Sequence, residues 1–431
     1  MKVSRRRLSQ HLAAISFLIL YPVFFFYNAG IAFGYIRPVL GGLYGAYSLI
    51  VVSIYAIILA PFAEDIRFHT AWIMKLSYIF VGWISFWVSF NYLFNRDPYA
   101  DKASLVLFGV LIQLLANFAI GVYLNLNAKW FIVSIFVLLL CMLVFVLSTF
   151  DRETLSVHGG LYWGEAKDLV DPESFATYQQ FARSTLLTSF IVFAIFNNFM
   201  IRLLVAFIST VILFLLSARS EIVGFLFAVM VFEILISLGK PSRIFVLASL
   251  GFFMAIFLAF VDNSFVRDLS GSRIMALGDL DRDSSWQIRS EFSHRALMQI
   301  IDNPLFGKFA GEYYEGLGEE GTYAHNILSA WVSLGLPGFL LYLSLLLGSF
   351  LVAIRRVIVT KGNSDLWNLA LLTSVTALLL SFSAKSFAEP WFGLVFGLVL
   401  NVSREESRSS QKRALRSPLS AQRALIIFFF R

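Results

Sequence analysis

The chain has 431 residues, of which 58% are hydrophobic and only 14% are charged, and its formal net charge is +7. A soluble protein of this length cannot bury so much apolar surface, because polar groups must cover much of its exterior. The composition therefore excludes a soluble globular protein, and the positive charge is explained by membrane topology rather than by a nucleic-acid partner.

Apolar runs long enough to cross a bilayer recur along the whole chain. At about 20 residues for each crossing, they predict an all-α polytopic membrane protein with about 12 transmembrane helices. Asn197, Asn198 and Arg202 divide one overlong run and predict a polar hairpin. The predicted spans are 12–33, 40–62, 73–94, 103–126, 129–150, 177–196, 198–217, 220–238, 242–262, 336–354, 365–384 and 389–402.

Lysine and arginine residues gather in alternate loops, which predicts that both termini lie in the cytoplasm. The predicted organisation has four parts. Residues 1–262 hold helices one to nine, with an outer loop at about 151–176. Residues 263–324 form a large periplasmic or extracellular loop, residues 325–402 hold helices ten to twelve, and residues 403–431 form a basic cytoplasmic tail.

The predicted spans hold few ionisable residues. We place Glu233 near an inner end and Lys385 near an outer end. Transporters instead place charges at mid-membrane and break their helices there. Because the polar residues gather at the outer face, the pattern favours an enzyme at the membrane surface. A flippase or exporter remains the alternative of a different class.

The large outer loop holds the first candidate catalytic group. Apolar residues at helical spacing from Trp286 to Ile301 predict an amphipathic helix lying on the membrane, and Asn303-Pro304 ends it. His325 then opens the next apolar run. The partial positive charge of a helix N-terminus disfavours imidazolium, and a neutral imidazole is suited to act as a general base. The alternative is an interfacial histidine that only satisfies a backbone group.

Two arginines predict an anion site on the same side. Arg219 lies in a tight outer turn between two spans, and Arg289 lies on the amphipathic helix. Guanidinium groups bind phosphate oxygens in a bidentate way, so the pair could grip a diphosphate. The alternatives are a snorkelling Arg219 and an Arg289 on a solvated helix face, with Arg295 as a nearby competitor.

Asp279, Asp281 and Asp283 alternate as metal-binding acids often do. Ser284 and Ser290, however, stand where a calcium loop requires glycine and glutamate. We interpret the run as a solvated acidic loop and expect no metal site.

Three stretches together resemble the bacterial O-antigen ligase and polymerase family over about residues 180–360. This chain departs from the family pattern at two places. Ser293 stands where many members have tryptophan, and Ser333-Leu334 stand just before Gly335, where many members have a glutamate. The similar stretches are Ser217-Ala218-Arg219-Ser220, Arg289 followed by Ala296-Leu297 and Asn303-Pro304-Leu305-Phe306-Gly307, and His325-Asn326 followed by Gly335 and Gly338.

The resemblance implies a C-type glycosyltransferase fold in the bacterial cytoplasmic (inner) membrane. It implies inverting, metal-independent transfer from a polyprenyl-diphosphate-linked glycan, with no cofactor. It implies that His325 is the catalytic base and that Arg219 and Arg289 bind the diphosphate. Flippase and chain-length regulator proteins become candidate partners beside the lipid bilayer. The candidate sugar- or acceptor-binding residues are Asn326, Trp286, Tyr313, Tyr314 and Tyr323.

Loop charge favours a polymerase over a ligase. Residues 263–324 hold more acids than bases, which suits a weakly charged repeat unit better than a phosphorylated core. Glycine and aromatic residues at 158–164 are of the kind that line a carbohydrate groove, and a membrane anchor explains them equally well. Ligation of a finished glycan to a lipid A core or a protein stays open. A multi-span mannosyltransferase or an oligosaccharyltransferase is disfavoured, because the first outer loop has Arg37 and no acid.

Overall fold

The computed structural model describes residues 5–33, 35–36, 43–59, 72–95, 97–149, 178–216, 218–237, 284–311, 314 and 324–403. Every regular element in these ranges is a helix, which agrees with the predicted all-α architecture. The predicted span 242–262, the outer loop 151–176 and most of the tail lie outside the described residues.

The helices follow the predicted spans wherever those spans are described. They are α1 (Arg5–Leu18), η1 (Ile19–Val23), α2 (Phe24–Ala32), α3 (Leu43–Leu59), α4 (Trp72–Phe94), α5 (Pro98–Tyr123), α6 (Lys129–Thr149), α8 (Tyr178–Ile195), α9 (Phe199–Leu215), α10 (Arg219–Ile236), α13 (Ser284–Asp302), α15 (Leu328–Thr360) and α16 (Asp365–Ser383). A further apolar helix, Phe392–Ser403, closes the described part of the chain.

Six helical stretches of the described residues are long and apolar enough to cross a membrane. Together with the shorter apolar helices, they support a multi-pass membrane protein. The number of twelve spans and the side on which each loop lies stay predictions. The six are Arg6–Ala32, Trp72–Phe94, Pro98–Tyr123, Lys129–Thr149, Leu328–Thr360 and Asp365–Ser383.

The first of these stretches contains a π-helical turn. It runs through α1, η1 and α2, and Pro22 lies inside the widened turn η1. Proline has no N–H to donate, so regular α-helical bonding cannot continue through it. The turn presents the buried Tyr21, whose hydroxyl donates to Asn117 Oδ1 of α5.

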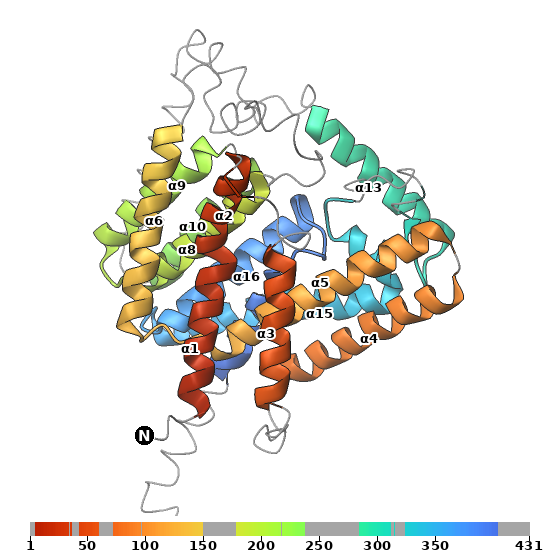
Figure 1. Cartoon of the computed structure of the whole chain (residues 1–431), viewed down its shortest axis with the longest axis horizontal. Coiled ribbons are helices and arrows are strands. Elements are labelled where there is room, and N and C mark those ends of the chain that lie inside the picture. The colour runs from red at the N-terminus through yellow and green to blue at the C-terminus, as the bar shows by residue number, and fades with distance from the viewer. Residues whose placement is uncertain are drawn as a thin grey trace, which may run out of the picture.

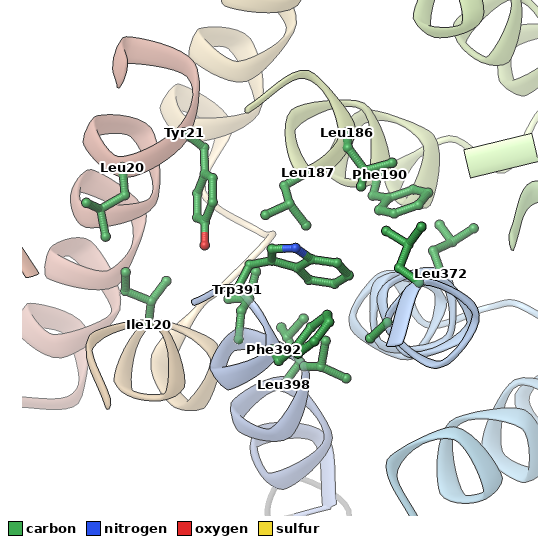
Figure 2. Close-up of a cluster of buried hydrophobic side chains, with 14 of the residues drawn as sticks. Leu20, Tyr21, Ile120, Leu186, Leu187, Phe190, Leu372, Trp391, Phe392 and Leu398 are labelled. Atoms are coloured by element: carbon green, nitrogen blue, oxygen red, sulfur yellow. The ribbon is translucent and has the colours of Figure 1, made fainter. Parts of the chain in front are cut away.

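Helix α16 lies at the centre of the bundle and contacts α8, α10 and α15 (Figure 1). In the same view α13 lies toward the end where α2 is found, and α1 lies toward the opposite end. Trp391, just before the helix Phe392–Ser403, is buried between Tyr21 and the side chains of α8 and α16 (Figure 2). The segment that leads from α16 into this last helix is therefore anchored in the core.

The predicted polar hairpin is confirmed, and its Arg202 forms a buried ion pair with Glu233 of α10. Helix α8 ends at Ile195, and Asn198 caps α9 by accepting from Met200 N at 2.9 Å. The Arg202 guanidinium binds both carboxylate oxygens of Glu233, with Nε 2.5 Å from Oε1 and Nη2 3.0 Å from Oε2. Both side chains are buried, and pairing is the usual condition for charges in such surroundings.

The expectation of spans with few ionisable residues was wrong. Arg183 and Glu221 lie within the ranges of predicted spans, as Glu233 does, and each has a partner of opposite charge. Composition alone hides these residues, because a few paired charges barely change the hydropathy of a span.

Candidate functional site

The site is built around a break in α15. Gly335 has φ 70° and ψ 178°, a conformation that only glycine adopts without strain. Two residues later, Pro337 has no N–H for the carbonyl of Ser333. Gly335 and Pro337 therefore interrupt the backbone hydrogen bonding of α15 near its N-terminal end and free its groups for other partners.

The segment after α13 fills this break with its own backbone. Lys308 N donates to Val332 O at 2.9 Å, and Leu336 N donates to Leu305 O at 3.0 Å. The approach requires glycine at position 307 as well. A Cβ on Gly307, whose φ is +67°, would lie 2.3 Å from Val332 O. The Pro-Leu-Phe-Gly and Gly-x-x-Gly stretches are thus two halves of one backbone junction.

Two tryptophans of α4 satisfy the other carbonyl groups at the break. Trp83 Nε1 donates to Leu334 O at 2.9 Å, and Trp87 Nε1 donates to Ser333 O at 3.1 Å. A buried carbonyl without a partner is costly, so the indoles stabilise the kinked form of α15. The Trp87 ring also stacks on Phe306, with centroids 5.9 Å apart.

Gly335→Ala is expected to lower the stability of this junction. Backbone strain alone costs about 1–3 kcal/mol at such a position. The added Cβ would also lie 2.7 Å from Leu305 O. Thermal unfolding of the purified protein in detergent should show a lower Tm. Gly82→Ala is the matched control, because a Cβ at that helical position in α4 meets nothing within 4 Å. An equal Tm for both variants would contradict the assigned role of Gly335.

His325 and Asn326 form the turn that precedes α15. Asn326 Oδ1 accepts from Leu328 N at 3.0 Å, and Asn326 O accepts from Ser329 Oγ at 2.8 Å. The asparagine therefore fixes the turn that carries the histidine, in the manner of an Asx turn. The half-buried His325 ring lies beside Phe292 of α13, with centroids 6.4 Å apart.

Ser293 joins this turn to the helix that carries Arg289. Its hydroxyl accepts from Asn326 Nδ2 at 2.8 Å and donates to Arg289 O at 2.8 Å. Below this contact, Ala296 and Ile300 of α13 pack against Ala324 and Val332. The serine that stands where tryptophan is common is therefore a direct link between Arg289 and the His325–Asn326 turn.

The structure separates Arg289 from its competitor Arg295. Arg295 pairs with Glu291 one turn away, and its guanidinium lies over the Phe292 ring at 5.9 Å. Within the described residues, the Arg289 guanidinium makes no hydrogen bond or ion pair, and its side chain is half-buried. Arg289 therefore differs from Arg295 in having no such partner among the described residues, and its part in binding an anion stays a prediction.

Arg219 is the first residue of α10 and lies four positions after Leu215, the last residue of α9. Two residues later, the buried Glu221 carboxylate pairs with Lys385, with Nζ 2.8 Å from Oε1, and accepts from Ser220 Oγ at 2.7 Å. Lys385 lies just after α16. An acidic residue in the first turn also suits the helix dipole.

The segment that holds Lys385 also contacts the histidine turn. Phe387 N donates to Ser329 Oγ at 3.2 Å, and Ser329 Oγ donates in turn to Asn326 O. A continuous set of contacts therefore runs from the start of α10 through residues 384–389 to the His325–Asn326 turn and on to α13. By this route, the structure connects the three segments that carry Arg219, His325 and Arg289.

Arg183 of α8 was not singled out in the sequence. Its Nη2 lies 2.5 Å from Glu389 Oε1, and its guanidinium lies 5.7 Å from the Tyr44 ring centroid. Tyr44 in turn donates to the Tyr21 hydroxyl and accepts from Asn117 Nδ2. The signal that could have found Arg183 is a lone arginine within the predicted span 177–196.

Among the candidate sugar-binding residues other than Asn326, Tyr314 is the one whose side chain is described. Its ring lies edge-on to Tyr99, with centroids 5.2 Å apart. Burial raises the pKa of the Tyr314 hydroxyl, and so do the hydrogen bond and the negative charge of Asp97. Its part in sugar binding stays a prediction. Tyr313, Tyr323 and the side chain of Trp286 lie outside the described residues, and so do Asp279, Asp281 and Asp283.

The stretch of the chain that holds these residues matches a known family model. Residues 204–343 match the family model described as O-antigen ligase. The match spans less than half of the chain and includes Arg219, Arg289 and His325. It bears out the resemblance to the O-antigen ligase and polymerase family and supports a ligase- or polymerase-like membrane enzyme that acts on a polyprenyl-linked glycan. No curated protein gives a significant match to the chain.

Proposed function

We propose that the protein is an inverting, metal-independent glycosyltransferase that polymerises polyprenyl-diphosphate-linked oligosaccharide repeat units. The product would be O-antigen, capsule or exopolysaccharide, made on the outer face of the bacterial cytoplasmic membrane. Both termini would lie in the cytoplasm, with residues 263–324 outside. The proposal rests on the predicted loop charges and on the site at the start of α15.

The chemistry follows from the residue types at this site. His325 removes the proton from a hydroxyl of the acceptor sugar, and that oxygen forms a bond to the anomeric carbon of the donor. The bond from this carbon to the diphosphate oxygen breaks, and polyprenyl diphosphate leaves. Arg219 and Arg289 neutralise the negative charge that develops on the leaving group, which is the part a metal ion plays elsewhere.

The hydrogen-bond chain from Arg289 O through Ser293 to Asn326 is the observation that carries the proposal. It connects the turn that carries the candidate base with the helix that carries one candidate anion-binding arginine. Catalysis of this kind depends on such fixed placement of base and charge. The family match to residues 204–343 supports the same assignment.

Deletion of the gene tests polymerisation against its alternatives. If the protein is a polymerase, the deletion strain should carry single repeat units on their usual acceptor, because transfer proceeds without chain growth. Gel analysis of the surface glycan, together with analysis of extracted lipid-linked sugars, gives the result.

The other outcomes point to other functions. Long chains that accumulate on the polyprenyl carrier would indicate a ligase, since growth would continue without transfer. Lipid-linked single units that fail to reach the outer face would indicate a flippase or exporter. Either result would overturn the proposed polymerase.

A further inference from the structure

Two neighbouring ion pairs lie outside the proposed chemistry. Lys385 and Glu221 form one ion pair, and Arg183 and Glu389 form the other. Two cations and two carboxylates make the cluster neutral. Three of the four, Glu221, Lys385 and Glu389, are less than 9% exposed. Buried pairs of this kind rarely add net stability over an apolar replacement, so the positions that they hold together call for an explanation.

The segment 384–389 that carries Lys385 and Glu389 is held on several sides. Lys385 reaches Glu221 of α10 and also donates to Gln179 Oε1 of α8 at 3.2 Å. Phe387 is buried, and its backbone N–H bonds Ser329, next to the histidine turn. Trp391 then fixes the end of the segment in the core (Figure 2). The segment therefore has a fixed position between α10 and α15.

We infer that Lys385 and Glu221 are positioning residues that set the distance between Arg219 and the Arg289–His325 pair. Arg219 is two residues from Glu221 on α10, whereas Arg289 and His325 are joined through Ser293 and Asn326. Residues 384–389 connect these two parts of the site. At one end Lys385 pairs with Glu221 of α10, and Phe387 N bonds Ser329 of α15. The inference rests on the proposed function, because it concerns two arginines that grip one diphosphate.

The Lys385 ammonium is suited to this task. Burial acts to lower its pKa, but the carboxylates of Glu221 and Glu389 raise the pKa above its ordinary value. The lysine therefore stays charged at neutral pH, as its pairing with Glu221 requires. Without Lys385, the buried Glu221 carboxylate would lose its partner, and this loss favours movement of the first turn of α10 toward water.

Binding of a polyprenyl diphosphate to the full-length protein in nanodiscs tests the inference. Lys385→Met should raise the Kd by about tenfold, since a displaced Arg219 no longer shares the diphosphate with Arg289. Lys385→Arg keeps the charge and should bind nearly as well as the wild type. Ser329→Ala is a milder change that removes two hydrogen bonds, the one from Phe387 N and the one to Asn326 O. It should raise the Kd by about threefold to fivefold.

The matched control is Arg202→Met. It also leaves a buried carboxylate unpaired, at Glu233, but this residue lies 14 positions after Arg219, toward the other end of α10. Its Kd for polyprenyl diphosphate should equal the wild-type value even if its Tm falls. A wild-type Kd in both Lys385→Met and Ser329→Ala, or an equal rise in Arg202→Met, would overturn the positioning role. If the wild-type protein itself does not bind polyprenyl diphosphate, the proposed function fails first, and the inference fails with it.

Discussion

His325→Ala is expected to lower glycan transfer by about 10²–10⁴-fold, which is the usual contribution of a general base. The variant should still insert and fold, because the hydrogen bonds that define the turn come from Asn326 and Ser329. Transfer from a polyprenyl-diphosphate-linked oligosaccharide, measured in proteoliposomes, gives the rate. Binding of polyprenyl diphosphate should be unchanged, since the imidazole acts on the acceptor.

His294→Ala is the control for this experiment. His294 lies on α13, one residue after Ser293, and its side chain is exposed. The same substitution there should leave the rate near that of the wild type. If His325→Ala retained wild-type transfer, the assignment of His325 as the base would be wrong.

Arg289→Ala should be the second most damaging substitution, with a loss of transfer of about 10²–10³-fold, the typical cost of removing one group that stabilises developing negative charge. The interaction strengthens as the diphosphate leaves, so we expect kcat to fall more than KM rises. Arg289→Lys should recover only part of the rate, because an ammonium cannot form the planar bidentate contact of a guanidinium.

Arg295→Ala is the matched control on the same helix. Its guanidinium is already paired with Glu291 on the exposed face of α13, and exposed pairs contribute little. We therefore expect a rate close to that of the wild type. A larger loss in Arg295→Ala than in Arg289→Ala would transfer the anion-binding role to Arg295. The backbone carbonyl of Arg289, which bonds Ser293, is present in every variant, so the helix contact is not under test.

The local features of the fold could be read from the sequence. The polar hairpin appears where Asn198 caps α9, and α13 ends at Asp302, directly before Asn303-Pro304. These predictions succeed because caps, prolines and hydrophobic periodicity act over a few residues. The motif residues His325 and Arg289 were also visible in the sequence, because they lie at unusual places in a chain that is otherwise apolar.

Other properties are decided only by contacts between distant parts of the chain. The sequence left Arg289 and Arg295 as competitors, and the pairing of Arg295 with Glu291 and Phe292 separates them. The partner of Lys385 is Glu221, 164 positions earlier, which no periodicity or motif indicates. The sequence placed Lys385 only near the end of a predicted span, whereas the structure pairs it with Glu221 in a buried cluster.

Gly307 and Gly335 also show the difference between what the sequence determines and what the tertiary structure decides. By itself the sequence determined that the chain is a helical membrane protein and that residues near His325 and Arg289 resemble one family, because hydropathy and short motifs are local properties. Only the tertiary structure decided what Gly307 and Gly335 do. They allow the backbone of residues 305–308 to bond into the broken turn of α15. The physical reason is that buried backbone groups and buried charges must find partners, and the packing of the helices determines which partners lie within reach.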